Sequence, residues 1–449
     1  MTGFLTITEM TKALAAGTVT SARLVEDSIT RSDAASGAHV FVTRQDTSAR
    51  QQAQDADAAR ALGHAKPYTG VPITIKDNVD LAGLPTTAGS KILANAPPAL
   101  ADAPVAQKLK DAGFVILGRT NMTEFAFSGL GVNPHYGTPL NPSFHAPHVP
   151  GGSSAGAGIS VAVGIAPAAI GTDTGGSVRI PAALSGIVGF KPTQAAVSWD
   201  GILPLSVSHD TVGVIAQTVS DCRAVFDVIR EDAKSAPTPP KRRIGLLTNF
   251  VMSHTQPEVE AGFRAAVARL IAGGIAAEPI EIPILDDIPE VNRNGTIAMA
   301  ECFAWHSAHL PGVPDSAYDP RVVARIRPGG KINAAALKTL HAFRQELIAA
   351  FTAAAEGFDA LAWPTLPMIA PAIADLVLDE DYHRINGLIL RNPTVVNLAD
   401  GCSISLPCPV IGAPVGIMLS SARGCDDALL AFAEMVERML ATPSTNHNH

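Results

Sequence analysis

Aromatic and charged side chains are scarce in this chain. Phe, Trp and Tyr make up 5% of its 449 residues and the four charged residue types 16%, whereas hydrophobic residues make up 47%. Few aromatics argue against a stacking platform for single-stranded nucleic acid. A net charge of −8, with no basic run, argues equally against binding a phosphate backbone. We therefore expect a folded chain with a large apolar core and no nucleic-acid partner.

Cysteine is also scarce, and its positions are scattered. The five cysteines are Cys222, Cys302, Cys402, Cys408 and Cys425. Because their number is odd and no CxxC pair occurs, the sequence predicts neither a disulfide framework nor a metal site. This pattern is typical of a reducing compartment, so we expect a cytoplasmic protein.

No segment has the composition of a signal peptide or of a membrane span. Glu9, Lys12 and Arg23 interrupt the apolar residues near the N-terminus, which argues against a secretory signal. Residues 149–172 carry no charge, but they are rich in Gly and Ser and contain Pro167. Such a composition favours a buried helix over a membrane-crossing one, so we expect no membrane partner.

The middle of the chain alternates strand-like and helix-like segments. The predicted order is a strand at Val71–Ile75, a helix at Ala103–Ala112, a strand at Phe114–Leu117, a helix at Ala155–Ile165 and a strand at Ala168–Gly171. Gly113 ends the first of these helices. The alternation is typical of α/β folds, in which helices cover a sheet.

The flanking regions continue the pattern. Residues 5–60 are predicted as helices, and residues 285–355 are the most helical and least motif-like part of the chain. Further predicted elements are strands at Arg243–Leu247, Ala360–Trp363, Ser403–Leu406 and Val415–Leu419 and helices at Pro257–Ala272 and Asp427–Leu440. Because no repeat or long linker interrupts the chain, we expect one domain over residues 1–441 and a loose tail at 442–449.

The segment Gly171–Arg179 is the first of three that indicate chemistry. Successive glycines before Ser177 allow several backbone N–H groups to converge on one point, and such a nest binds an oxyanion. Ser177 also stands at the start of an expected helix, whose dipole favours negative charge. Its hydroxyl is therefore placed to attack a carbonyl carbon. Taken alone, the segment fits equally well a tight turn in which Ser177 only caps the helix.

Lys76 and the segment Gly151–Gly156 supply the other two signals. A serine nucleophile needs a base. A lysine serves as one only when burial or a nearby positive charge lowers its pKa. Lys76 ends an apolar strand in a region with few charges, which suits that role, although a single lysine in such a place is more often a surface residue. The three segments together favour an active site.

These segments resemble those of the amidase signature family, whose members use a Ser–cis-Ser–Lys triad. The similarity covers Gly70–Asn78, Gly118–Phe125, Pro150–Ser154, Gly171–Arg179 and Gly189–Thr193. A sparser match follows at Asp210, Gly213, Thr218 and Asp221. The signature core thus covers about residues 65–225. The resemblance implies a large mixed β-sheet covered by helices on both faces, in a single α/β domain, with a variable helical region at about 285–355.

The resemblance also assigns roles at matching positions. It implies that Lys76 is the base, that Ser153 is the relay serine with a cis peptide bond from Gly152, and that Ser177 is the nucleophile. The implied oxyanion hole consists of the backbone N–H groups of Thr174, Gly175, Gly176 and Ser177. The implied reaction is hydrolysis of the carbonyl C–N bond of a small amide or carbamate (urethane) through an acyl-enzyme on Ser177. Side activity on esters or anilides is compatible with it, and neither a metal nor an organic cofactor is needed.

The substrate contacts and the assembly are less constrained. By analogy with the family, the candidate substrate-binding residues are Met122, Thr123, Phe125 and Ser154. Asp173, Arg179 and Asp210 carry charge in apolar surroundings, and we expect them to form a buried structural ion pair near the site rather than to contact substrate. Both a monomer and a homodimer are compatible with the sequence.

Two other enzyme classes, and one class without activity, stay open. Gly152–Gly156 also fits G-x-S-x-G, which would make Ser154 the nucleophile of an α/β-hydrolase-like esterase with His209 or His306 as its base. That interpretation leaves the segment Gly171–Arg179 without a role. The chain also resembles the glutamine-hydrolysing subunit of a tRNA-dependent amidotransferase, which would need a protein partner. A binding protein of this fold without catalysis is a third class, against which the intact triad argues.

Overall fold

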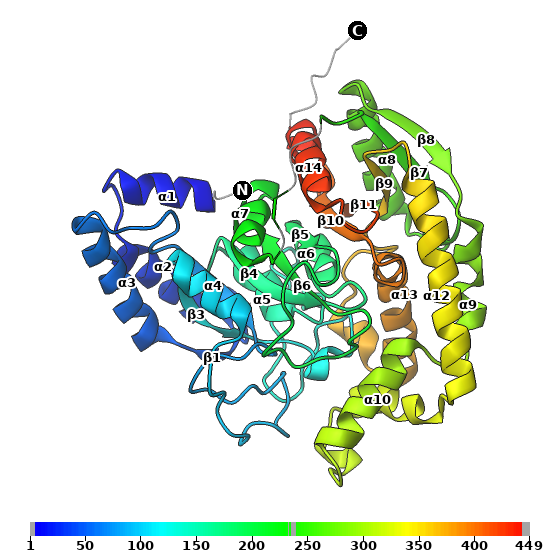
Figure 1. Cartoon of the computed structure of the whole chain (residues 1–449), viewed down its shortest axis with the longest axis horizontal. Coiled ribbons are helices and arrows are strands. Elements are labelled where there is room, and N and C mark those ends of the chain that lie inside the picture. The colour runs from blue at the N-terminus through cyan, green and yellow to red at the C-terminus, as the bar shows by residue number, and fades with distance from the viewer. Residues whose placement is uncertain (1–4, 232, 235–238, 442–449) are drawn as a thin grey trace.

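One mixed β-sheet runs through the described part of the chain, which comprises residues 5–231, 233–234 and 239–441 of a computed structural model. Within these residues the sheet has 11 strands in the order β1-β3-β2-β4-β6-β5-β10-β11-β9-β7-β8 (Figure 1). The strands are β1 Phe41–Arg44, β2 Pro72–Lys76, β3 Val115–Thr120, β4 Ala168–Asp173, β5 Val188–Lys191, β6 Thr211–Ala216, β7 Arg243–Leu247, β8 Ala276–Ile280, β9 Ala360–Pro364, β10 Cys402–Pro407 and β11 Gly416–Ser421. The tail predicted at 442–449 lies outside the described residues.

The sheet combines parallel and antiparallel pairs. Strand β2 pairs in parallel with β3 and β4, and β7 pairs in parallel with β8 and β9. The pairs between β4, β6, β5, β10, β11 and β9 are antiparallel. The mixed sheet expected from the resemblance is therefore confirmed.

Helices cover both faces of this sheet. They are α1 Ile7–Ala15, α2 Ser21–Asp33, α3 Asp46–Ala61, α4 Pro104–Ala112, α5 Ala155–Ala162, α6 Arg179–Ser185, α7 Val219–Ile229, α8 Pro257–Ala272, α9 Ile288–Val291, α10 Ile297–His309, α11 Pro320–Ile326, α12 Ala334–Ala355, α13 Asp379–Leu398 and α14 Asp426–Ala441. On one face α1, α4, α7, α8 and α14 share a core with the strands. On the other face the strands pack against α5 and α6 and against α12 and α13.

The alternation of side chains along β2 determines the face of the sheet on which Lys76 lies. Successive residues of a strand point to opposite faces of the sheet. Ile73 and Ile75 belong to the core shared with α4 and α7. Thr74 points the other way, where its hydroxyl lies 2.9 Å from that of Ser160 on α5. Lys76 therefore shares the α5 face with Thr74.

Four of the strands were not expected from the sequence. Strand β1 lies within residues 5–60, which were predicted as helices, and it is only four residues long and half-buried. The edge strand β8 is mostly exposed and contains Pro279, so it has no apolar pattern. Strand β5 is also only four residues long, and β6 is interrupted by Gly213. Such short or interrupted strands carry too weak a period to be recognised in a single sequence.

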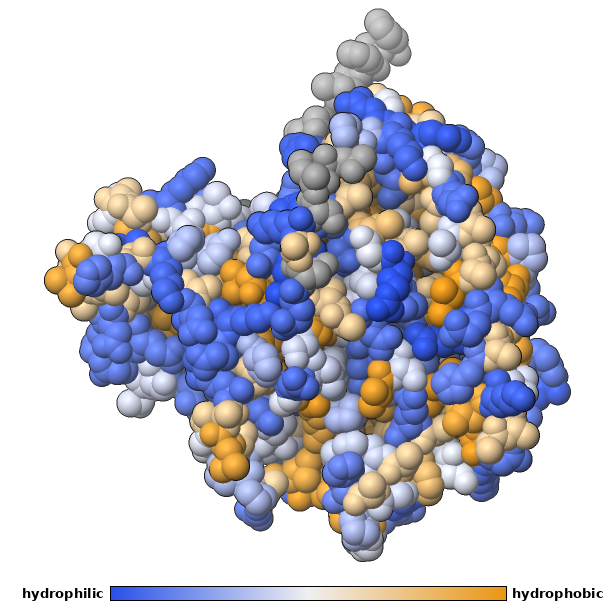
Figure 2. Space-filling model, in the orientation of Figure 1, coloured by the Kyte–Doolittle hydropathy of each residue, from blue (hydrophilic) through white to orange (hydrophobic). Residues whose placement is uncertain are grey.

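The surface mixes polar and apolar residues. On the face drawn in Figure 2, hydrophilic and hydrophobic residues are interspersed. Large exposed hydrophobic residues occur at scattered sites such as Leu62, Leu100 and Ile411. In the described ranges, no helix combines the length and the apolar composition needed to cross a membrane.

Candidate active site

Two parallel strands deliver the key groups of the site to one edge of the sheet. Strand β2 ends at Lys76, and its neighbour β4 ends at Asp173. Ile75 of β2 pairs with Ile170 of β4. Lys76 is the next residue along β2, and Thr172 lies two residues further along β4. The carboxyl ends of such strands lie side by side, and the loops that follow them commonly carry function.

Lys76 contacts one of the two predicted triad serines directly. Its Nζ lies 2.8 Å from the Ser153 hydroxyl and 2.8 Å from the Thr172 hydroxyl, and it is 3.3 Å from the Thr172 carbonyl oxygen. Burial lowers the pKa of Lys76 to about 7, and the negative charges of Asp173 and Asp210 offset only part of that effect. Near neutral pH a large fraction of Lys76 is therefore uncharged and able to accept a proton.

Thr172 is a contact that the sequence analysis missed. Its hydroxyl accepts from Lys76 and, at 3.3 Å, from the amide of Asn78. Thr172 stands within the segment Gly171–Arg179, but the sequence analysis assigned it no role. If the parallel pairing of β2 with β4 had been known, Thr172 could have been placed beside Lys76. This contact is therefore predictable from the strand register and not from the motif.

The loop before α5 positions Ser153. The Gly152–Ser153 peptide bond is cis, as the resemblance implied. The Gly152 N–H donates to the Gly129 carbonyl at 2.7 Å, and the Ser153 carbonyl accepts from the Thr123 N–H at 3.1 Å. Ser153 is completely buried. Its hydroxyl is thereby fixed against Lys76.

A buried ion pair shapes the turn that carries Ser177. The Asp173 carboxylate accepts from Arg179 Nε at 3.1 Å and from Arg179 Nη2 at 2.9 Å, and both side chains are fully buried. The same carboxylate accepts from the N–H groups of Gly176 at 2.8 Å and Val178 at 3.1 Å. Despite the burial, the Arg179 guanidinium holds the pKa of Asp173 well below its usual range. The expected structural ion pair is thus present between these two residues.

The same turn leaves three main-chain donors available. Within the described residues, the N–H groups of Thr174, Gly175 and Ser177 have no protein acceptor. The N–H of Gly176 is occupied by Asp173, so this donor of the expected oxyanion hole is engaged elsewhere. Gly176 has a φ of +120°, and a Cβ there would lie 2.5 Å from Pro393 on α13, so only glycine fits.

Asp210 holds the other side of this turn without pairing with a cation. Its carboxylate accepts from the Thr174 hydroxyl and from the N–H groups of Leu205 and Ser206, the latter two at 2.9 Å. Burial raises the pKa of Asp210 to about 7. The expectation of an ion pair is therefore wrong for Asp210, because neutral donors surround it.

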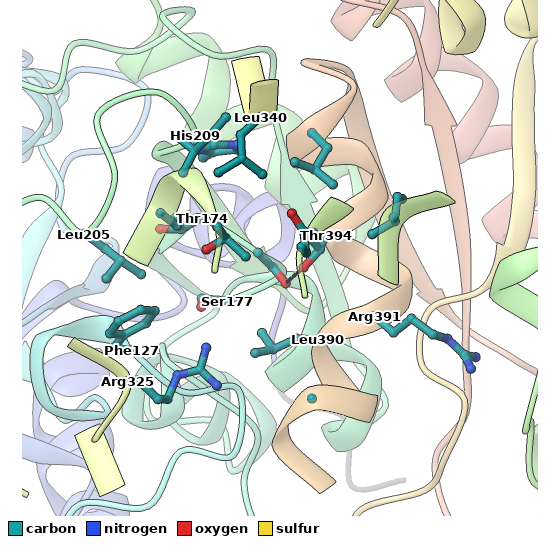
Figure 3. A pocket seen from close by; sticks show the side chains of 18 of the residues that line it. Phe127, Thr174, Ser177, Leu205, His209, Arg325, Leu340, Leu390, Arg391 and Thr394 are labelled. Atoms are coloured by element: carbon teal, nitrogen blue, oxygen red, sulfur yellow. Dashed lines mark hydrogen bonds between the residues drawn. The ribbon is translucent and has the colours of Figure 1, made fainter. Parts of the chain in front are cut away.

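A cavity of about 420 Å³ opens over this turn. Ser177, Thr174 and Gly175 line it on the side of the sheet. Figure 3 shows Phe127, Leu205, Leu340 and Leu390 around Ser177, and other lining residues come from α9, α10 and α12. The helical region 285–355 thus supplies much of the wall, whereas the signature core supplies the polar floor. Residues 126–128, Arg325 and Leu390 were not identified from the sequence.

The four residues that we expected to contact substrate lie behind this wall. Met122, Thr123, Phe125 and Ser154 are buried, and none of them lines the cavity. Phe125 packs instead edge-on against His306, with ring centroids 4.5 Å apart. Positive φ angles at Phe125 and Ala126 turn the chain, so that Ala126, Phe127 and Ser128 face the cavity in their place.

The arrangement gives the esterase interpretation no support. The Ser154 hydroxyl is buried and donates to the Thr172 carbonyl at 3.3 Å. His209 instead contacts the Ser206 hydroxyl, and His306 contacts the Tyr318 hydroxyl. Among the described residues, neither histidine is hydrogen-bonded to Ser154, so this serine has no base beside it. The described residues also contain no group of three His, Cys, Asp or Glu side chains that could hold a metal ion.

Comparison with known proteins agrees with this fold. A model of the Amidase family matches residues 23–430. A 2-amino-5-chloromuconic acid deaminase from Comamonas testosteroni is 35% identical over 393 residues, which is 86% of this chain and 84% of that protein. A glutamyl-tRNA(Gln) amidotransferase subunit from Roseiflexus castenholzii is 32% identical, and the match covers 97% of this chain and 96% of that protein.

A solved structure supports the same assignment. A crystal structure of an amidase superposes with a TM-score of 0.89 at 29% identity, covering 97% of this chain and 100% of that one. The chain therefore belongs to the amidase (amidase signature) family and is a hydrolase that acts on carbon–nitrogen bonds.

Proposed function

We propose that this protein hydrolyses the carbonyl C–N bond of small amides or carbamates through an acyl-enzyme on Ser177, with Ser153 and Lys76 as its proton relay. The observation that carries the proposal is the contact of 2.8 Å between Lys76 Nζ and the Ser153 hydroxyl. Burial brings the pKa of this lysine to about 7, the value that a general base needs near neutral pH.

The proposed proton path runs from Ser177 through Ser153 to Lys76. Neutral Lys76 accepts the proton of Ser153, and Ser153 accepts that of Ser177 as the Ser177 oxygen attacks the carbonyl carbon. The unoccupied N–H groups of Thr174, Gly175 and Ser177 stabilise the negative oxygen that results. The proton then returns along the same path to the leaving nitrogen, and the C–N bond breaks. Water attacks the acyl-enzyme in the second half-reaction and restores the Ser177 hydroxyl.

The cavity restricts the substrate more than the relay does. An oxyanion hole stabilises any tetrahedral adduct of a carbonyl group, so amides, carbamates, esters and anilides are all chemically compatible with it. The walls around Ser177 are largely apolar, with Phe127, Leu205, Leu340 and Leu390 among them. A small substrate with an apolar body next to its carbonyl group fits this lining best.

A hydrolysis panel tests the proposal. Amide, carbamate and ester substrates that share one acyl group and one leaving group are compared on the unmodified protein and on the Ser177→Ala variant. We expect kcat/KM for the amide and the carbamate to fall about 10⁴-fold in this variant, because the nucleophile is lost. Ser154→Ala is the matched control and should cost far less. A larger loss in Ser154→Ala than in Ser177→Ala would refute the assignment.

A second function is favoured by the relative from Roseiflexus castenholzii. That protein matches nearly the whole chain, so a glutamine-hydrolysing subunit of a tRNA-dependent amidotransferase is the alternative. Such a protein would act on glutamine together with a protein partner. Hydrolysis of simple amides by the purified chain alone would favour the first proposal. Activity on glutamine that appears only after the other subunits are added would favour the second.

A further inference from the structure

An arginine that has no hydrogen-bond partner among the described residues projects into the cavity that Ser177 lines. Arg325 lies on α11 and lines the same cavity as Ser177. Figure 3 shows its guanidinium group pointing into the space next to Ser177. Its Nε is buried and has no hydrogen-bond partner. The guanidinium group of Arg325 lies over the ring of Phe127, with its Cζ 4.6 Å from the ring centroid.

The lack of a hydrogen-bond partner distinguishes Arg325 from Arg391 and Arg344. Arg391, which also borders the cavity, donates to the carbonyl groups of Val251 and Ser253. Arg344 donates to the Leu398 carbonyl at 3.2 Å. For Arg325, by contrast, no carboxylate, carbonyl or hydroxyl group among the described residues accepts a hydrogen bond.

Two carboxylates at the start of α11 are engaged by other donors. Glu124 accepts from the N–H of Asp319 at 2.7 Å, just before α11 begins, and from the Ser90 hydroxyl at 2.6 Å. Asp319 in turn accepts from the N–H of Arg321 and caps the helix. These bonds attach the start of α11 to the signature core. They hold the helix that carries Arg325 in place without neutralising the guanidinium group.

Arg325 is half-buried, and its Nε is buried without a hydrogen-bond partner. This is unfavourable, because the lost hydration of that nitrogen is not replaced. The stacking on Phe127 restores only part of the loss. The guanidinium group carries a planar row of donors that matches a carboxylate with two parallel hydrogen bonds. An arginine that opens into a cavity with largely apolar walls is thus prepared for an anionic group of the substrate.

We propose that Arg325 binds a carboxylate of the substrate, so that the preferred substrates are amides or carbamates that carry a carboxylate group close to the scissile carbonyl. This inference rests on the proposed function, since it assigns a specificity-determining residue to the same site. The inference narrows the proposed substrates from small amides or carbamates in general to those that carry one carboxylate group.

Binding measurements test the inference independently of catalysis. In the Ser177→Ala background, calorimetry compares succinamate and glutaramate with the uncharged diamides of the same length. We expect at least one of the two acids to bind about tenfold or more tightly than its diamide, because hydrogen bonds between charged groups are the strong ones. Equal binding of the acids and the diamides would overturn the inference, whether or not the chain hydrolyses amides.

Variants then assign the preference to Arg325. Adding Arg325→Gln should abolish the preference for the acid, and adding Arg325→Lys should retain part of it. Arg327→Gln is the matched control, since Arg327 lies two residues further on, is exposed and pairs with Asp315; it should leave the preference unchanged. A preference that persists in Arg325→Gln would refute the role of Arg325. This variant should melt no lower than its parent, because it removes a cation that has no partner.

Discussion

At the scale of single residues, the proposed role of Lys76 as the base predicts how activity depends on pH. Only uncharged Lys76 accepts a proton, and burial lowers its pKa to about 7. Because deprotonation creates the active form, kcat/KM should rise with pH through about 7 and level off above it. The check is a pH profile between 5.5 and 9.5, with circular dichroism showing that the fold persists. A rate that falls steadily from pH 6 to 9 would rule out Lys76 as the base.

The residues of the proposed relay could be selected from the sequence, but those of the cavity wall could not. Lys76, Ser153 and Ser177 stand in segments with distinctive composition, and the resemblance gave each a role. The wall residues Arg325 and Leu340 come from helices far along the chain and have no local signal. Their position depends on how α11 and α12 pack, which a single sequence does not reveal. Phe125 does not line the cavity, because a local turn of the backbone places Phe127 there instead.

At the scale of elements, the Asp173–Arg179 pair connects β4, the turn with Ser177, and α6. Arg179 also donates to Asn397 of α13 at 2.7 Å, and Asn397 donates to Asp173 at 2.9 Å. The pair therefore fixes the turn against the helix whose Pro393 packs on Gly176. We expect this network to determine stability as well as the placement of the N–H donors.

Removing one partner of this pair should be strongly destabilising. In Arg179→Met the charge of Asp173 stays buried without its cation, so the free energy of unfolding should fall by about 3–5 kcal/mol. The check is denaturation by urea. The double variant Asp173→Asn with Arg179→Met should lose less than the sum of the two single variants, because no unpaired charge remains. Additive losses would show that the two side chains do not act as a pair.

The prediction of elements succeeded where the apolar pattern was clear and failed where it was weak. Arg243–Leu247 and Pro257–Ala272 were predicted with the bounds observed for β7 and α8. Both have a clear apolar pattern, and Gly273 and Gly274 follow the helix. Strand β1 was missed because its four residues derive their pairing from β3, which follows more than 70 residues later. Pairing partners so distant leave no trace in the local composition.

At the scale of the whole molecule, the chemical groups and the cavity wall come from different halves of the chain. The relay and the N–H donors belong to β2, the loop before α5 and the turn after β4. Much of the wall belongs to α9–α13. The two halves are joined within one sheet, because β5 pairs with β10 across the middle. Helix α6, which begins just after Ser177, packs on both of these strands.

This continuity leads us to propose that the described chain unfolds as one cooperative unit. Two tryptophans report on the two halves: Trp199 lies within the signature core, and Trp363 lies in β9 and is fully buried. In variants that retain only one of them, the other tryptophans being replaced by Phe, the fluorescence transition in urea should coincide with the circular dichroism transition. Each variant is its own reference, so a loss of stability from replacing Trp363 does not affect the comparison.

Separate transitions would contradict this expectation. If the Trp363 fluorescence changed at a lower urea concentration than the circular dichroism, the strands β9, β7 and β8 would unfold while the rest of the sheet persisted. Ser177 would then lose the wall of its cavity while Lys76 and Ser153 were still in place. Substrate binding would therefore fail at a lower urea concentration than labelling of Ser177 by a serine-reactive probe. Because β10 pairs with both β5 and β11, we expect substrate binding and labelling of Ser177 to be lost together at the urea midpoint.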